Sequence, residues 1–382
     1  MKRFFLFSIL GLLMALPGAA HAAPLKSALE VSGWIPYWRA ATGTADVLPR
    51  IASLTAVHPF GYIVTNTGVL SDPTGFADEP WKSLRAAAKK NGVRYIPTIM
   101  WSDGASMHRI LSNATTRQKL EDDVAALVVR EGFDGIDIDF ESKYAETRDY
   151  FSLFLKGLYQ RMGQKWVYCT IESRTPLDSR YDGTPPKDAG VYANDFVQIN
   201  KYCDRVQIMA YDQGAIDVKL NGTAAGPYIP VADVAWVEKV MTLAAQTISK
   251  KKLVLGIPTY GYEYTVTPLP TSGYSYSRLW AFNPKYGTDL AMSLGLKPIR
   301  NSAGELQLTY LATSTPTVAG VRTSSAAAGP AAAGAQTINI LSWSDSTAIA
   351  QKIALAKKLG IRGVAFFKFD GGEDQNTWNL IQ

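Results

Sequence analysis

Three acidic residues stand at alternate positions in one short segment, Asp134-Gly135-Ile136-Asp137-Ile138-Asp139-Phe140-Glu141. Side chains alternate between the two faces of a β-strand, so Asp137, Asp139 and Glu141 should share one face, opposite the apolar residues. Keeping three neighbouring carboxylates ionised in an interior with little water would cost much free energy. We therefore expect them to share a proton and at least one of them to have a raised pKa. A carboxylic acid that stays protonated near neutral pH suits general acid catalysis. We expect Glu141 to be the proton donor, with Asp137 and Asp139 as a coupled pair beneath it.

A metal site or a purely structural role fits the acidic segment less well. A calcium loop would have Gly at its sixth position and Glu at its twelfth, and this segment has neither. A DxD metal site, as in sugar-nucleotide transferases, and buried carboxylates without a catalytic role remain alternatives. Two cysteines and three histidines exclude a four-thiolate zinc site and weaken Ser-His-Asp chemistry. We therefore expect no metal and no cofactor.

Short apolar runs alternate with helical patterns along the chain. We interpret 29–35, 56–65, 94–100, 135–140, 166–171, 205–210, 253–258 and 363–369 as strands, and 116–130, 146–162 and 346–359 as helices. This alternation predicts an α/β fold, a (β/α)8 TIM barrel, with the acidic segment as its fourth strand. Glu141 would then lie at the C-terminal end of the strand, where barrel active sites form. A doubly wound open sheet is the alternative, but no Gly-rich phosphate loop follows the first strand.

The spacing of the predicted strands changes once. About a hundred residues separate the seventh from the eighth strand, so we expect an α+β insertion at about 262–340 within a catalytic barrel that spans 23–382. The low-complexity stretch 324–335 is typical of a loop. Cys169 falls inside a predicted strand and Cys203 in a connection, so we expect the two cysteines to remain unpaired.

The first residues have the pattern of a secretory signal. Lys2 and Arg3 precede an apolar run at 4–16, Pro17 and Gly18 end that run, and small residues follow at 20–22. We expect 1–22 to be removed and the protein to work in the periplasm or cell wall, without stable membrane insertion; an uncleaved anchor is the alternative. The net charge of +6 is mild and unclustered, so we do not expect nucleic-acid binding. We expect a monomer.

The segment 134–141 resembles the DGxDxDxE signature of family 18 glycoside hydrolases, the chitinase family. Further segments resemble the same family at its first, sixth and seventh strands and before its last helix: GWIPYW at 33–38, QIMAYD at 207–212, GIPTYG at 256–261 and WSD at 343–345. The resemblance covers most of the chain and implies a barrel with an insertion after the seventh strand. It also implies a hydrolase that cleaves β-1,4 bonds next to N-acetylglucosamine, in chitin, chito-oligosaccharides or peptidoglycan.

The resemblance implies substrate-assisted catalysis, which retains configuration without a protein nucleophile. Glu141 would protonate the scissile oxygen while the 2-acetamido oxygen of the substrate attacks C1. Asp139 would orient the acetamide N–H, and Asp137 would share a proton with Asp139. Tyr211 would donate a hydrogen bond to the acetamide oxygen. Two more residues would hold the sugar, Asp212 by contact and Met209 by packing below it. No metal is required.

Aromatic side chains at predicted strand ends would supply the surface on which sugar rings pack. The candidates are Trp34, Trp38, Trp101, Tyr260, Tyr262 and Phe367. The chain also departs from the family. It lacks the SxGG motif after the third strand, and it has Phe367 where a Trp usually lies under the cleaved sugar.

The fifth strand ends in Glu172-Ser173-Arg174, where many relatives are apolar. These two charges either reshape the cleft or pair with each other. The first and third strands also resemble family members that act on bacterial wall or spore peptidoglycan, so the sequence leaves chitin and peptidoglycan open. A barrel that binds glycans without cutting them is the alternative function. The retained acidic positions favour the enzyme.

Overall fold

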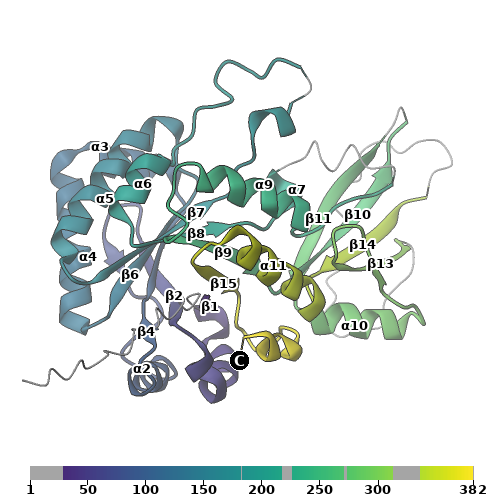
Figure 1. Cartoon of the computed structure of the whole chain (residues 1–382), viewed down its shortest axis with the longest axis horizontal. Helices are drawn as coiled ribbons and strands as arrows, with labels where there is room; N and C mark the ends of the chain where they lie inside the picture. The colour runs from purple at the N-terminus through teal and green to yellow at the C-terminus, as the bar shows by residue number, and fades with distance from the viewer. Residues whose placement is uncertain (1–28, 182, 217–225, 271–272, 313–335, 382) are drawn as a thin grey trace, which may run out of the picture.

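The computed structural model describes residues 29–381 except 182, 217–225, 271–272 and 313–335 (Figure 1). The expected signal at 1–22 and the low-complexity stretch at 324–335 lie outside the described residues. Among the helices that are described, none is both long enough and apolar enough to cross a bilayer.

Parallel strands in the described part of the chain close into a barrel, because β1 pairs with both β2 and β15. In chain order the barrel strands are β1 (Glu30–Pro36), β2 (Ala56–Val64), β5 (Thr98–Trp101), β6 (Gly135–Phe140), β7 (Trp166–Glu172), β8 (Arg205–Met209), β9 (Leu253–Pro258) and β15 (Gly363–Phe367). Two short strands join the same sheet, β3 (Leu70–Ser71) and β4 (Arg94–Tyr95). The prediction of a (β/α)8 TIM barrel is confirmed.

Helices cover the outside of the barrel (Figure 1). They are α1 (Ala40–Val47), α2 (Trp81–Lys90), α3 (Gly104–Ser112), α4 (Ala114–Glu131), α5 (Arg148–Met162), α6 (Phe196–Tyr202), α7 (Gln213–Ile216), α9 (Val234–Ala245) and α11 (Ser346–Leu359). The short 3-10 helices are η1 (Tyr37–Arg39), η2 (Leu48–Ser53), η3 (Ala145–Thr147), η4 (Leu177–Ser179) and η5 (Gln375–Leu380). The bounds of α11 match the sequence prediction, because Asp345 caps its first turn and Gly360 ends it in the left-handed conformation (φ +66°).

The third predicted strand, 94–100, is divided in the structure. Pro97 has no backbone N–H to donate to a ladder, and it separates β4 from β5. The eighth strand is also shorter than predicted: β15 ends at Phe367, after which Lys368 donates its backbone N–H to the Thr259 hydroxyl.

The insertion between the seventh and eighth barrel strands is a five-stranded antiparallel sheet in the order β11-β10-β14-β13-β12, which lies beside the barrel (Figure 1). Its elements are β10 (Gly261–Pro268), β11 (Tyr274–Phe282), α10 (Pro284–Ser293), β12 (Ile299–Arg300), β13 (Leu306–Leu311) and β14 (Ile338–Trp343). Phe282, Leu290 and Trp343 form part of a separate apolar core between α10 and this sheet.

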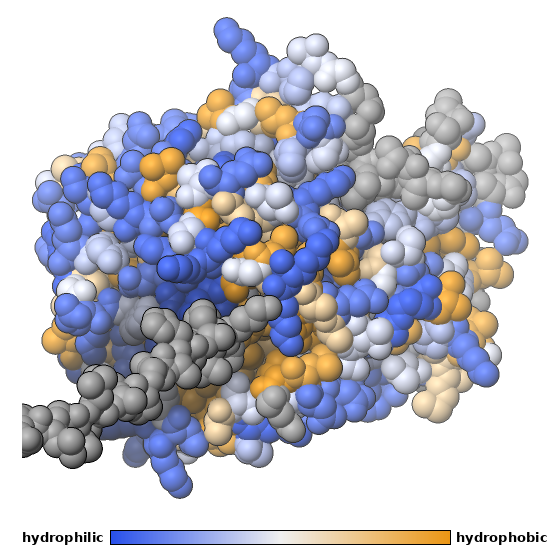
Figure 2. Space-filling view, viewed as in Figure 1, coloured by the Kyte–Doolittle hydropathy of each residue, from blue (hydrophilic) through white to orange (hydrophobic). Residues whose placement is uncertain are grey.

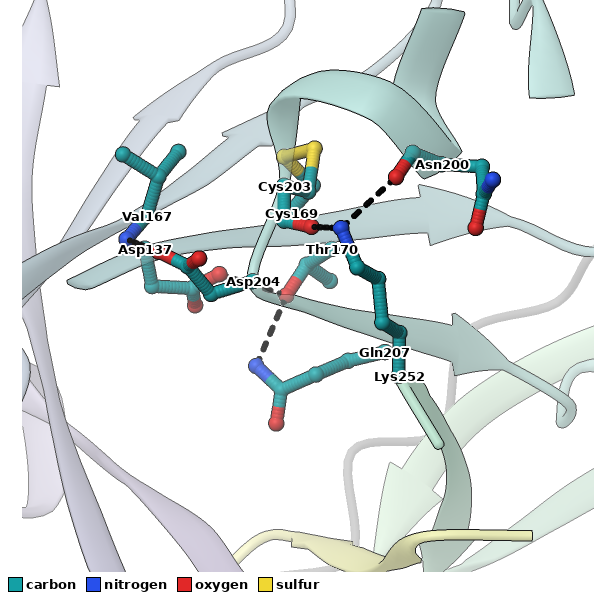
Figure 3. Close-up of a disulfide and its surroundings, with 9 residues drawn as sticks. All are labelled: Asp137, Val167, Cys169, Thr170, Asn200, Cys203, Asp204, Gln207 and Lys252. Carbon is teal, nitrogen blue, oxygen red and sulfur yellow. Dashed lines mark hydrogen bonds between the residues drawn. A yellow bond between two sulfur atoms is a disulfide. The ribbon is translucent and has the colours of Figure 1, made fainter. Parts of the chain in front are cut away.

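The two cysteines form a disulfide, and our expectation that they stay unpaired is wrong (Figure 3). Cys203 lies between α6 and β8, and Tyr168 pairs with Arg205 in the ladder, so the connection passes the outer face of β7. That geometry brings the Cα atoms of Cys169 and Cys203 to 6.0 Å. The prediction considered only the element in which each cysteine lies. It overlooked the parallel pairing of β7 with β8, which places the two segments side by side.

The face of the molecule seen in Figure 2 is mainly hydrophilic, with hydrophobic residues in separate patches. This pattern is that of an ordinary protein surface, in which single apolar residues are commonly scattered. The surface in this view therefore shows no large apolar contact area.

Candidate active site

The acidic strand places its carboxylates in the barrel interior. Ile136, Ile138 and Phe140 pack outward in the main apolar core, so Asp137 and Asp139 point inward from alternate positions of β6. Asp137 is fully buried and Asp139 is 4% exposed. Glu141 follows the end of β6, where its backbone N–H donates to the carbonyl of Trp101. The three carboxyl groups therefore rise from the middle of the barrel to its C-terminal mouth.

Asp137, the deepest of the three, accepts hydrogen bonds from three strands. Trp34 Nε1 and Thr98 Oγ1 donate to Oδ2 at 3.0 and 2.8 Å, and Thr170 Oγ1 donates to Oδ1 at 2.8 Å. Gln207 Nε2 in turn donates to Thr170 Oγ1 at 3.2 Å (Figure 3). A buried carboxylate needs such donors, because burial without hydrogen bonds is costly.

Asp139 has different surroundings. Its Oδ1 is buried without a hydrogen-bond partner among the described residues. Burial raises the pKa of Asp139 well above its ordinary value, and the charges of Glu141 and Asp137 raise it further. The surroundings of Asp139 therefore favour its protonated form, whereas Asp137 is supplied with hydrogen-bond donors. Two like groups in unlike surroundings are the pattern from which acid and base roles arise.

Glu141 lies half-buried at the mouth, where burial raises its pKa and the charges of Glu172 and Asp212 add to that effect. Tyr211, just past β8, is buried, and its ring stacks on Phe367 with a centroid distance of 5.7 Å. Burial also raises the pKa of Tyr211 well above its ordinary value, so its hydroxyl stays protonated and can donate. Met209 is half-buried and packs against the main core.

Asp212 is held by two tyrosines of the insertion side. Tyr260 donates its hydroxyl to Asp212 Oδ1, and Tyr262 donates to the same atom at 2.9 Å. Asp212 has a left-handed backbone (φ +59°), an uncommon conformation for a residue other than glycine. Its side chain is thereby fixed toward the mouth, next to Tyr211.

A cleft of about 440 Å³ opens between the barrel mouth and the insertion sheet. Trp38 and Phe367 line it from the barrel, and Trp280 lines it from β11. Trp38 is half-exposed and meets Phe60 edge to face at 5.8 Å. Arg39, whose side chain is 45% exposed, lines the same cleft together with Asp370, and its Nε lies 3.9 Å from Asp370 Oδ2. Aromatic rings with a few polar groups are typical of a sugar-binding cleft.

Two of the predicted aromatic contacts need correction. Trp101 is 2% exposed, packs edge to face on Phe140 and donates Nε1 to Ser106 at 3.1 Å, so it lies on the outer face of β5 and not in the cleft. Strand alternation explains this, because Thr98 and Met100 are the inward residues of β5. Trp34 is 1% exposed and lies beneath Phe367, at a centroid distance of 5.9 Å. It supports the floor and offers no open face to a sugar.

The two charges at the end of β7 do not pair with each other. Glu172 pairs with Lys143 at 3.2 Å, whereas the Arg174 guanidinium stacks on Phe196 and Tyr192 at 3.6 and 4.3 Å from their ring centres. Sequence reasoning also missed Lys143 and the interior donors Thr98 and Thr170. Side chains alternate along β5 and β7, and this alternation could have shown that the two threonines point into the barrel.

Known proteins provide a comparison for this geometry. Residues 34–372 match the sequence model of the glycosyl hydrolases of family 18. The uncharacterized glycosylase YvbX of Bacillus subtilis is 28% identical over 220 residues, which are 56% of this chain and 60% of that protein. The matched part is thus less than two thirds of that relative's length. No group of three or more His, Cys, Asp or Glu residues able to hold a metal occurs in the described residues.

Solved structures agree on the fold. The spore cortex-lytic enzyme SleL of Bacillus megaterium superposes with a TM-score of 0.69 at 20% identity, covering 94% of this chain and 74% of that one. A class V chitinase from Pseudomonas fluorescens gives 0.70 at 20% identity, covering 93% and 99%. The family match spans most of the chain, so the protein belongs to family 18 of the glycosyl hydrolases.

Proposed function

We propose that this protein cleaves β-1,4 bonds next to N-acetylglucosamine by substrate-assisted, retaining catalysis. The observation that carries the proposal is the inward row of Asp137, Asp139 and Glu141. The buried Asp139 lacks a partner for one oxygen among the described residues, and Glu141 follows the end of β6 at the barrel mouth, within reach of the charge of the cleft residue Asp212. The 2-acetamido group of an N-acetylated sugar can interact with both the free oxygen of Asp139 and the acid Glu141. Its N–H needs an acceptor, and its attack on C1 needs an acid at the leaving oxygen.

The first step breaks the glycosidic bond. Glu141 gives its proton to the leaving oxygen, and the acetamido oxygen bonds to C1 to form a cyclic oxazolinium ion. Asp139 yields its proton to Asp137 and accepts a hydrogen bond from the acetamide N–H, so its negative charge offsets the positive ring. Tyr211 donates to the acetamido oxygen. Asp212 and Met209 position the sugar at the barrel mouth.

The second step releases the product. Glu141, now a carboxylate, takes a proton from water as that water attacks C1 and opens the oxazolinium ring. Two inversions at C1 retain the configuration of the sugar. The proton returns from Asp137 to Asp139, and the site regains its starting state. No group other than the substrate, water and the protein's own residues takes part.

We propose peptidoglycan as the polymer, ahead of chitin. A solved relative of the same fold is named as a cortex-lytic enzyme, and this chain has Phe367 where chitinases usually have Trp. Arg39 lies 3.9 Å from Asp370, but its side chain is 45% exposed in the cleft, so it can also bind a carboxylate of the glycan, which neutral chitin lacks. A secreted location fits both the pattern at 1–22 and the Cys169–Cys203 disulfide, because disulfides persist in oxidising compartments.

Mass spectrometry of products tests this function. The protein is incubated with chito-oligosaccharides and with purified peptidoglycan, and new reducing-end N-acetylglucosamine is the expected product. Glu141→Gln should lower turnover by about a thousandfold, within the range for loss of a general acid. Glu146→Gln, an exposed residue in the next turn, is the matched control. Equal turnover by the two variants would show that Glu141 is not the general acid.

A glycan-binding barrel without turnover is the second candidate. In that case both polymers would bind, with no products from either one. The raised pKa values of Asp139 and Glu141 favour the enzyme, because a protein that only binds glycans gains nothing from keeping buried acids protonated.

A further inference from the structure

Glu172 stands beside Glu141 at the mouth of the barrel. In the parallel ladder Asp139 pairs with Thr170, so the residues that follow bring Glu172 level with Glu141 on the neighbouring strand. Thr170 points inward to Asp137, and Glu172, two residues later, is on the same face. Glu172 also lines a second pocket of about 250 Å³, together with Lys143 and Asn194, and this pocket shares no lining residue with the aromatic cleft.

Glu172 and Lys143 hold the backbone on both sides of Glu141. Glu172 Oε1 accepts the backbone N–H of Ser142 at 3.0 Å, and the Lys143 ammonium donates to the carbonyl of Phe140. The two side chains pair at 3.2 Å, and the Lys143 side chain is only 1% exposed. Asn194 Nδ2 donates to Glu172 Oε2 at 2.7 Å and so fixes the carboxylate from the following loop.

The backbone that these contacts hold is an unusual one. Ser142 has φ +57°, the left-handed region that residues other than glycine rarely adopt. Such a conformation is energetically unfavourable and persists where surrounding contacts enforce it. The hydrogen bond from Ser142 N–H to Glu172 is a contact of this kind, directly after the residue whose direction it controls.

We propose that Glu172 is a positioning residue for the acid of this site: it fixes the turn that carries Glu141 and places a negative charge beside it. The inference rests on the proposed function, because it assigns Glu172 to the reaction of Glu141. It also explains why a charged residue ends β7 where many relatives are apolar.

The charges around Glu141 support this proposal. Burial favours protonation of Glu172, but the charge of Lys143 and the hydrogen bonds from Asn194 and Lys143 hold its pKa below the ordinary value. Glu172 is therefore an anion, and it raises the pKa of Glu141 together with burial and Asp212. Lys143 on the same loop acts against them. The negative charge of Glu172 thus favours the protonated form of Glu141.

Two substitutions of Glu172 distinguish its effect on the turn at Ser142 from the effect of its negative charge. Glu172→Gln keeps an oxygen for Ser142 N–H but removes the charge and leaves the positive charge of Lys143 uncompensated, so the pKa of Glu141 should fall by about one unit. Glu172→Asp keeps the charge but shortens the reach to Ser142, so the pKa should stay within a few tenths while kcat falls about tenfold. The matched control is Glu238→Gln on α9, where Glu238 forms an exposed ion pair with Lys358 of α11.

The pKa of Glu141 is measured by carboxyl ¹³C NMR of the free protein, and kcat/KM is followed against pH with an aryl glycoside of chitobiose. For Glu172→Gln we expect the NMR titration of Glu141 and the alkaline limb of the profile to move to lower pH together. If both match the wild type and Glu238→Gln, the proposal is overturned. If Glu172→Gln does not fold, Glu172→Asp decides: an unchanged kcat overturns the proposal. An absence of turnover by the wild type would reject the proposed function, and the NMR titration would still decide the electrostatic part of this inference.

Discussion

Asp137 lies where donors from β1, β5 and β7 meet, and each of them can be removed singly. Thr170→Val keeps the shape of the side chain and removes the donor to Oδ1. We expect about 1–3 kcal/mol of lost stability, because a buried acceptor loses its partner. We also expect kcat to fall about tenfold, because a buried carboxylate that has lost a donor holds a proton more tightly, so Asp137 would return the proton to Asp139 less readily.

A matched substitution is available in α1. The hydroxyl of Thr44 is buried without a hydrogen-bond partner among the described residues, and Thr44 is 2% exposed. Thr44→Val should leave both stability and kcat nearly unchanged. Urea denaturation and steady-state kinetics on both variants make the comparison; equal effects would mean that the Thr170 hydroxyl has no special role.

Glu373, in the loop after β15, gives stability a pH dependence. Burial and the hydrogen bond and charge of Asp46 raise the pKa of Glu373 from 4.5 to about 8. The folded state therefore keeps a proton that the unfolded chain releases. Its contribution to stability is fully present below pH 4.5 and is lost as the pH rises through about 8.

Glu373→Gln imitates the protonated form, so its advantage over the wild type should grow with pH. Differential scanning calorimetry at about pH 5 and about pH 9 should show little difference at the lower pH and a higher Tm for the variant at the upper one. Glu146→Gln, at an exposed site, should not change with pH in this way. A constant difference between Glu373→Gln and wild type would contradict the assignment.

At the scale of elements, the disulfide ties the connection after α6 to β7 across 34 residues. Closing a loop of that length should stabilise the fold by about 4 kcal/mol through the unfolded chain. Cys169→Ala/Cys203→Ala should therefore unfold at lower urea than the oxidised wild type. Under reducing conditions with full reduction confirmed by thiol titration, the two proteins should differ by far less, and an equally large gap there would point to packing instead.

Sequence reasoning succeeded where one element decided the outcome. The alternation of β6 was enough to predict that Asp137 and Asp139 point inward, and the helical pattern of 346–359 was enough to predict α11. It failed where two elements had to be placed together. Trp101 was assigned to the cleft without the parity of β5, and Cys203 was considered without the register that sets it against β7.

The partner of Glu172 shows the same limit. Arg174 is two residues away in sequence, yet Glu172 pairs with Lys143 from the loop after the neighbouring strand. Spacing along one strand end cannot reveal such a pair, because the contact depends on how β6 and β7 are aligned and on the turn at Ser142. Roles at the barrel mouth are thus set by neighbouring strand ends jointly.

At the scale of the whole molecule, the insertion sheet forms one wall of the cleft. Trp280 reaches the cleft from β11, where Nε1 donates to Glu263 at 2.7 Å and the ring packs edge to face on Tyr286 at 4.4 Å. Trp280→Ala should raise KM for a hexasaccharide about tenfold, because a fixed aromatic face is lost. KM for a disaccharide glycoside should change by less than about twofold, since a short substrate depends mainly on the barrel mouth.

The control for that comparison lies on the same sheet. Leu311 on β13 is 43% exposed and is not among the residues that line the cleft. Leu311→Ala should leave KM for both substrates unchanged. If Trp280→Ala instead raised KM equally for the short and the long substrate, Trp280 would affect binding at the barrel mouth itself, and not the binding of the more distant sugars of a long glycan.

The insertion leaves and rejoins the barrel at one place. Gly261 at its start pairs with Trp343 at its end, and Ser344 donates its backbone N–H to the carbonyl of Tyr260 at 3.2 Å. A cassette whose ends touch can be exchanged for a shorter or longer one without opening the barrel or lengthening its other loops. The insertion sheet of a relative can thus be grafted between 261 and 343. Such an exchange changes which polymers the cleft binds and leaves the geometry of the acidic residues in the barrel unchanged.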